Sequence, residues 1–188
     1  MKVMKIILLR HSEPDYSGVD ARGFVGFARD FAPLTQQGIK LAHKASKFPE
    51  FSGAEIIVSS PVTRALQTAA IISKNLHLDL TVDIGFHERL PDVQNLLKTQ
   101  EEIEKSYEEY DACKGVFSDN KLHHWESVEQ QISRVKSSLA SYMEKFYSKI
   151  IIVTHGELMR RFAPGRRDFC GLVEVEYTEG FEFLAGVR

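Results

Sequence analysis

The chain has 188 residues, of which 43% are hydrophobic and 27% charged, and this is enough for one domain with a substantial core. Its formal net charge of −2 gives no basis for binding to nucleic acid or to an anionic membrane surface. The sequence has two cysteines far apart, which does not suggest a disulfide framework. The apolar run after the basic start is too short for a signal peptide or a membrane span, so we expect a cytoplasmic protein.

Buried strands and amphipathic helices alternate through the first half of the chain. Residues 3–9 form a nearly continuous apolar run, which is typical of a strand covered on both faces. After a loop rich in glycine and proline, a threonine is placed to cap a helix over 35–48, and a second strand is expected over 55–59. The serine and proline that follow resemble the N-cap and first residue of a helix over 60–75, which leads to a short strand over 80–82.

The second half of the chain continues the alternation after a more polar stretch over 89–126. The elements expected there are helices over 100–110, over 128–146 and from Gly156, and strands over 150–154, 172–176 and 181–185. This order predicts an α/β fold, a three-layer sandwich around a mainly parallel sheet. We expect a single domain over 1–188, with 89–126 as a helical insertion or lid over the active-site edge.

Residues capable of chemistry follow the ends of the expected strands. His11 comes directly after the first strand, preceded by Arg10, and His155 comes directly after the strand over 150–154. Arg64 lies near the start of a helix, and Glu88 follows the third strand by a few residues. Because ligands bind beyond the carboxyl ends of the strands in open α/β sheets, we expect these side chains to converge at one edge.

The converging residue types suit phosphoryl transfer. A neutral imidazole is a nucleophile near neutral pH, and guanidinium groups bind phosphate oxygens in pairs and stabilise the transferred group. Backbone N–H groups at a helix starting at Gly156 would point to the same anion, and Glu88 is placed to protonate a leaving oxygen.

Five sequence blocks in this order resemble those of the histidine phosphatase superfamily, also called the phosphoglycerate mutase-like family. They are Arg10-His11-Ser12, where the family has Arg-His-Gly, then Leu34-Thr35-Gln36-Gln37-Gly38, the run from Ser59 to Ala69, Phe86-His87-Glu88, and Val153-Thr154-His155-Gly156. The resemblance covers most of the chain and favours the phosphatase members.

The resemblance implies a role for each matching residue. His11 would become phosphorylated, Glu88 would donate the proton, and His155 would complete the catalytic set. The phosphate-binding residues would be Arg10, Arg64, Ser17 and Gly156. No metal or organic cofactor is implied, and the partner would be a small phosphorylated substrate.

Two positions depart from the family pattern. Ser12 replaces a glycine whose carbonyl orients the nucleophilic imidazole in the family, and a positive φ there would now cost energy. Ser17 stands roughly where many members carry an asparagine that contacts phosphate.

Several functions stay open at this point. The leading hypothesis is hydrolysis of a phosphomonoester through a phosphohistidine. The alternatives are a phosphoglycerate mutase-type transfer, a metal-dependent hydrolysis in which His11, His155 and Glu88 would be the ligands, and a regulatory or binding member with an impaired pocket.

Overall fold

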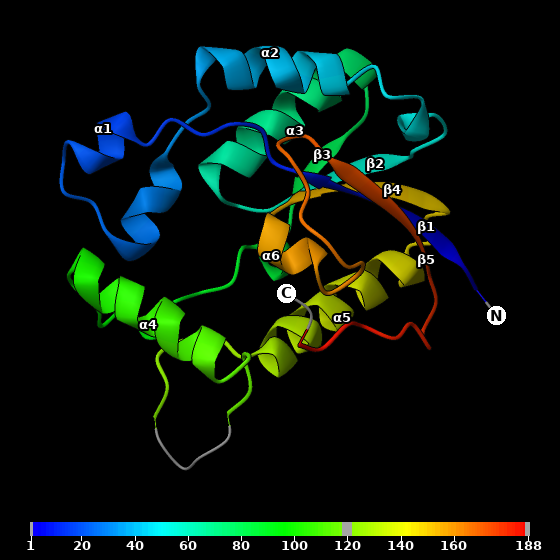
Figure 1. Cartoon of the computed structure of the whole chain (residues 1–188). Coiled ribbons are helices and arrows are strands. Elements are labelled where there is room, and N and C mark those ends of the chain that lie inside the picture. The colour runs from blue at the N-terminus through cyan, green and yellow to red at the C-terminus, as the bar shows by residue number, and fades with distance from the viewer. Residues whose placement is uncertain (1, 118–121, 187–188) are drawn as a thin grey trace.

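The computed structural model describes residues 2–117 and 122–186, and its centre is a five-stranded sheet (Figure 1). The strands are β1 (Met4–Arg10), β2 (Ile56–Ser59), β3 (Leu80–Val82), β4 (Lys149–Thr154) and β5 (Leu172–Tyr177). Their order in the sheet is β3-β2-β4-β1-β5; the first four are parallel and β5 adds an antiparallel edge next to β1. The predicted α/β fold with a mainly parallel sheet is confirmed.

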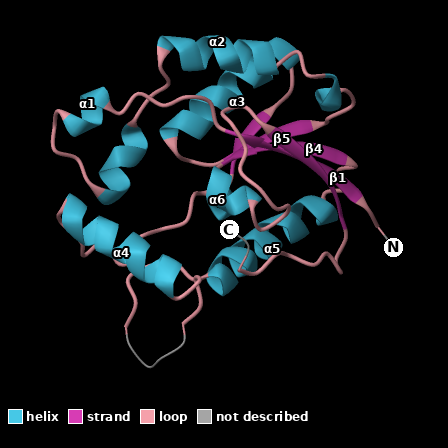
Figure 2. Cartoon of the chain, in the orientation of Figure 1, coloured by secondary structure: helices cyan, strands magenta, loops and turns pink. Residues whose placement is uncertain are grey.

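Helices cover both faces of the sheet. They are α1 (Ser17–Asp20), α2 (Gln36–Ala45), α3 (Thr63–Leu76), α4 (Gln100–Ala112), α5 (Val128–Glu144) and α6 (Gly156–Met159), with 3-10 helices at Gly26–Phe31, Pro49–Phe51 and Ile84–Phe86. Figure 2 shows α2 and α3 on one side of the sheet and α5 and α6 on the other. Within the described residues, no helix is both long and apolar enough to cross a membrane.

The period-two alternation of the strands divides the core into two layers. On β1, Ile6 and Leu8 pack into the cluster that contains residues of α5, whereas Ile7 and Leu9 pack into the cluster that contains residues of α3. All four side chains are fully buried, which accounts for the continuous apolar run in the sequence. Because both faces are covered, the open part of the sheet is its edge at the carboxyl ends of the parallel strands.

The start of α3 differs from the prediction. The helix begins at Thr63 with Val62 as its N-cap, so Ser60 is not the cap and Pro61 is not the first helical residue. The Ser60 hydroxyl lies 2.8 Å from Nε2 of His155 and accepts only a long bond, 3.3 Å, from the backbone N–H of Val62. The Ser60 side chain therefore faces His155 at the edge of the sheet instead of capping α3.

The predicted ends of two helices and the last strand are also wrong. Helix α2 stops at Ala45, because Phe48 precedes a proline and adopts an extended backbone. Helix α5 stops at Glu144. Residues 181–185 form no strand: Phe181 and Phe183 turn back and pack on the α5 side of the core, so that β5 stays the edge strand.

The described residues of the segment 89–126 contain α4, and several of them line one cavity together with Glu88. Thr99 and Glu102 form a capping box at the start of this helix, with reciprocal side-chain to backbone bonds. The helix packs through Tyr110 on the fully buried Trp125, in a small cluster separate from the two sheet layers. Residues 118–121 lie outside the described residues, and the roles as insertion and lid stay predictions, as does the single domain over 1–188.

Candidate active site

The first of the two strand-end histidines is held in one tautomer. Nδ1 of His11 lies 2.7 Å from the backbone carbonyl of Ser12, and since a carbonyl only accepts, Nδ1 carries the proton. Nε2 is then free of a proton, and it accepts a hydrogen bond from Nε of Arg64 at 3.3 Å. The Nε2 lone pair of the imidazole thus points at a guanidinium group.

The serine that replaces the family glycine fits without strain. Ser12 does not adopt a positive φ. Its backbone N–H donates to Oγ1 of Thr68 at 2.9 Å, and its hydroxyl donates to the carbonyl of Gly38 at 2.7 Å. The side chain is therefore turned toward the first turn of α2 and leaves the carbonyl available for His11.

A close backbone approach explains the glycine of the second block. A Cβ atom at position 38 would lie 2.3 Å from the carbonyl oxygen of Glu13. The two segments also share side-chain bonds, because Thr35 caps α2 through Gly38 and donates its hydroxyl to Glu13 at 2.5 Å. This contact fixes the loop after β1, and with it the position of Ser12.

Arg64 contacts three other side chains of the site. It lies in the first turn of α3 and is 7% exposed. Besides the bond to His11, its Nη1 pairs with Oδ1 of Asp30 at 2.9 Å, and its Nη2 lies 3.5 Å from Nδ1 of His155. Asp30 belongs to the 3-10 helix Gly26–Phe31, and the sequence contained no motif that singled it out.

His155 carries its proton on the other ring nitrogen, Nε2, in contrast to His11. Nδ1 of His155 faces Arg64, which can only donate, so Nε2 carries the proton and donates to the Ser60 hydroxyl at 2.8 Å. The rings of His11 and His155 lie 5.1 Å apart between centroids. The prediction that the two imidazoles meet at one edge of the sheet is confirmed.

Burial keeps both imidazoles uncharged. Burial first, and then the guanidinium of Arg64, lower the pKa of His11 to about 3. Burial, followed by the neighbouring His11 and Arg64, holds the pKa of His155 well below its ordinary value. Both rings are therefore neutral near pH 7, as a nucleophilic imidazole must be.

Arg10 approaches from the other side of His11. Its Nη1 donates to the carbonyl of Arg167 at 2.6 Å, and its guanidinium lies over the ring of Phe169 at 4.6 Å. Its Nε is buried, and within the part of the chain that the structure describes it has no hydrogen-bond partner. Gly156 lies beside it, since a Cβ there would be 3.5 Å from the same Nε. Arg10 thus presents a buried N–H donor next to the start of α6.

Glu88 lines a cavity whose wall also includes Arg64. This cavity has a volume of about 70 Å³, and Glu88, Asp30 and His87 contribute to its wall. Oε1 of Glu88 accepts a hydrogen bond from the backbone N–H of Arg89 at 3.0 Å. Burial raises the pKa of Glu88, while the Arg89 N–H and Arg64 act in the opposite direction.

Arg89 belongs to none of the sequence blocks that point to the site. It lines the cavity next to Glu88, and its guanidinium lies over the rings of Tyr107 and Tyr110 at 4.7 and 3.8 Å. Its Nε and Nη1 are buried and have no hydrogen-bond partner among the described residues. Its position directly after Glu88 is the only feature of the sequence that could have pointed to it.

Ser17 is placed differently from the other expected phosphate ligands. It is exposed at the start of α1, and its hydroxyl donates to Oδ1 of Asp15 at 2.6 Å. No described hydrogen bond joins it to His11 or to Arg64. Its role as a phosphate ligand stays a prediction.

Comparison with known proteins agrees with this architecture. The fold is that of the phosphoglycerate mutase-like proteins: a mycobacterial glucosyl-3-phosphoglycerate phosphatase superposes with a TM-score of 0.72 at 18% identity, over 99% of this chain and 98% of that one. Residues 6–165 match the histidine phosphatase superfamily (branch 1), and the chain belongs to this family.

Two curated relatives represent two activities of the family. The chain is 29% identical over 154 residues to the uncharacterized phosphatase PhoE of Bacillus subtilis, covering 80% of this chain and 71% of that protein. It is 25% identical over 159 residues to the probable phosphoglycerate mutase GpmB of Proteus mirabilis, covering 82% of this chain and 70% of that protein. Phosphatases and mutases are thus both represented among its relatives.

Proposed function

We propose that this protein is a phosphatase that hydrolyses a small phosphomonoester through a covalent phosphohistidine on His11. The observation that carries the proposal is the fixed tautomer of His11, with Nδ1 bound to the Ser12 carbonyl and Nε2 directed at Arg64. A phosphoryl group that binds beside Nε2 and the guanidinium meets a lone pair on one side and donors on the other.

In the first step, Nε2 of His11 forms a bond to phosphorus while the bond from phosphorus to the leaving oxygen breaks. Arg10 and Arg64 donate to the phosphoryl oxygens, and His155 and Gly156 complete the wall of this pocket. Glu88, protonated before the step, gives its proton to the leaving oxygen. The raised pKa of Glu88 favours this protonated form.

In the second step, water attacks the phosphohistidine. Glu88, now a carboxylate, takes a proton from the water as the new oxygen–phosphorus bond forms and the nitrogen–phosphorus bond breaks. Inorganic phosphate leaves, and His11 returns to its neutral state with Nδ1 still bound to Ser12. The cycle needs no change in the tautomer of His11.

Trapping the intermediate tests the assignment of the nucleophile. The protein is mixed with a ³²P-labelled aryl phosphate, quenched in base, and assayed for alkali-stable, acid-labile label. We expect label on the wild type and on His155→Gln, which is slower but keeps the nucleophile, and none on His11→Gln. His155→Gln is the matched control, because it replaces a neighbouring buried imidazole. Label that persists in His11→Gln contradicts the proposal.

The arrangement disfavours a metal ion between the two histidines. The donors of Arg64 lie 3.3 Å from Nε2 of His11 and 3.5 Å from Nδ1 of His155, which are the nitrogens that a metal would need. A fixed cation in that place repels a second one. We therefore propose an activity without a metal, which a chelator leaves unchanged.

A second candidate is phosphoryl transfer of the phosphoglycerate mutase type, and Arg89 favours it. Its two buried N–H groups, which have no partner in the described ranges 2–117 and 122–186, line the cavity next to Glu88, where a second anionic group of a substrate could bind. Incubation with 3-phosphoglycerate separates the candidates: release of inorganic phosphate supports hydrolysis, and formation of 2-phosphoglycerate supports the mutase.

A further inference from the structure

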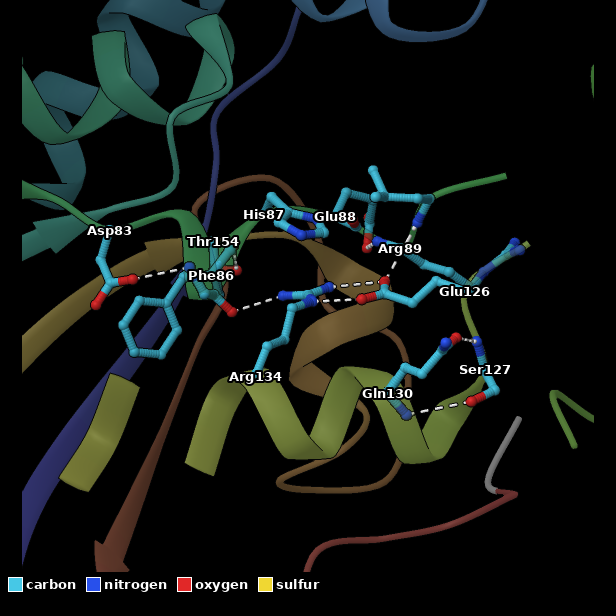
Figure 3. A network of polar contacts seen from close by, with 12 residues as sticks. Asp83, Phe86, His87, Glu88, Arg89, Glu126, Ser127, Gln130, Arg134 and Thr154 are labelled. Atoms are coloured by element: carbon cyan, nitrogen blue, oxygen red, sulfur yellow. Dashed lines mark hydrogen bonds and ion pairs between the residues drawn. The ribbon is translucent and has the colours of Figure 1, made fainter. Parts of the chain in front are cut away.

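The segment that carries Glu88 is bonded to an ion pair near the start of α5, Glu126 with Arg134, whose side chains are 6% and 16% exposed (Figure 3). We propose that this pair is a positioning device for the proton donor: it fixes the backbone on both sides of Glu88 and thereby places the carboxyl group in the cavity. This inference rests on the proposed function, because it assumes that Glu88 is the proton donor.

Arg134 holds the segment before Glu88. Its Nε and Nη2 donate to the two carboxylate oxygens of Glu126 at 2.5 and 2.9 Å, in the paired geometry that is strongest for these groups. Its Nη1 donates to the backbone carbonyl of Gly85 at 2.5 Å. The guanidinium thus bonds to Glu126 on one side and to the segment on the other.

Glu126 holds the segment after Glu88. Its backbone N–H donates to the carbonyl of Leu90 at 2.9 Å, and its carboxylate oxygen Oε2 accepts from the N–H of Leu90 at 3.3 Å. Gly85 and Leu90 lie three residues before and two residues after Glu88. One ion pair therefore bonds to the main chain on both sides of the proton donor.

Two further contacts place the segment between α5 and β4. A Cβ atom at Gly85 would lie 1.9 Å from Oγ and 2.9 Å from Cβ of Ser138, so the segment approaches α5 closely at this glycine. The Thr154 hydroxyl donates to the carbonyl of Phe86 at 2.8 Å, and Thr154 directly precedes His155. These contacts fix the position of the proposed proton donor relative to β4, the strand that His155 directly follows.

The pair suits a positioning role better than a purely stabilising one. Glu126 is 5% exposed, and buried ion pairs lose in desolvation most of what they gain in attraction. What an apolar replacement could not supply is the set of bonds to the carbonyl of Gly85 and the N–H of Leu90. No described hydrogen bond joins the pair to His11 or Arg64, so loosening it would displace the acid and leave the nucleophile in place.

The test uses the dependence of rate on the leaving group. A good leaving group such as 2,4-dinitrophenolate departs without a proton, whereas an alkoxide needs one. For Glu126→Gln and Arg134→Lys we measure kcat/KM, which covers the steps up to phosphorylation of His11 and leaves out the attack of water, where Glu88 acts as a base. We expect kcat/KM to fall roughly 10–100-fold with an alkyl phosphate, part of the 10²–10⁴ that a general acid supplies, and less than about threefold with 2,4-dinitrophenyl phosphate. The basic limb of the pH profile with the alkyl phosphate should change as well.

Gln130→Ala is the matched control for a loss of stability. Gln130 forms the capping box of α5 with Ser127, on the same helix, and has no described bond to residues 85–90. The Gln130→Ala variant should lower kcat/KM with the two substrates by the same factor or leave both values unchanged. Equal losses with both substrates in Glu126→Gln and Arg134→Lys, or a Gln130→Ala pattern like theirs, would overturn the positioning role.

Glu88→Gln in the same assay separates this inference from the proposed function. If Glu88→Gln shows no preference for the good leaving group, the assignment of the proton donor fails. If Glu88→Gln shows that preference and the two pair variants do not, the positioning role alone fails. Circular dichroism and phosphate binding confirm that each variant is folded with an intact pocket.

Discussion

The burial that keeps His11 neutral should cost the protein stability in acid. The ring is 5% exposed and its pKa is about 3, against an ordinary value of 6.5 in the unfolded chain. Between these values the unfolded state binds a proton that the folded state does not, so the free energy of unfolding falls as the pH falls through this window. At pH 5 the difference is 1.5 pH units, and at about 1.36 kcal/mol per unit this amounts to about 2 kcal/mol.

Replacing His11 by glutamine, which does not titrate, should remove this contribution. Urea unfolding at pH 8 and pH 5 gives the loss of unfolding free energy for the wild type and for His11→Gln. We expect the loss in the variant to be smaller by about 2 kcal/mol. His43→Gln, which replaces an exposed histidine on α2, is the control for exchange of a histidine outside the site. Equal slopes for the wild type and His11→Gln would refute the reasoning.

Three other substitutions test single contacts. Gly38→Ala puts a Cβ within 2.3 Å of the carbonyl of Glu13, and should lower the unfolding free energy by about 1–3 kcal/mol in urea titrations. Ser60→Ala leaves Nε2 of His155 without its acceptor, and should reduce kcat/KM roughly tenfold, about the cost of one buried hydrogen bond. Phe146→Gly relieves a left-handed backbone (φ 64°) at an exposed side chain, and should raise the thermal midpoint through a gain of about 1 kcal/mol.

The sequence predicted the fold where local pattern and burial agree. The apolar run of β1 is buried on both faces, and the helical period of α5 matches its packing on the sheet. It failed at Ser60, because the rule for an N-cap describes a helix end in isolation. Here the hydroxyl bonds to His155, which is 95 residues away in the sequence, and no local rule contains that contact.

The same distinction applies to the site. The two histidines could be placed together because both follow parallel strands, and topology alone sets the edge where such residues meet. Asp30 could not be found in this way, because it reaches Arg64 from a short 3-10 helix, which has no periodic signal in the sequence. Ser17 was expected at the phosphate site on resemblance alone, and the structure shows its hydroxyl bonded to Asp15.

The contacts of Arg64 connect these observations to chemistry. Its three nitrogens face His11, Asp30 and His155, so the guanidinium is held in one orientation before any substrate binds. A preorganised cation needs no rearrangement as charge develops on a phosphoryl group, which is the condition for strong electrostatic stabilisation. Its charge also helps to lower the pKa of His11. The residue proposed to bind the phosphoryl group therefore also helps to keep the proposed nucleophile unprotonated, so that replacing Arg64 would impair binding and nucleophilicity together.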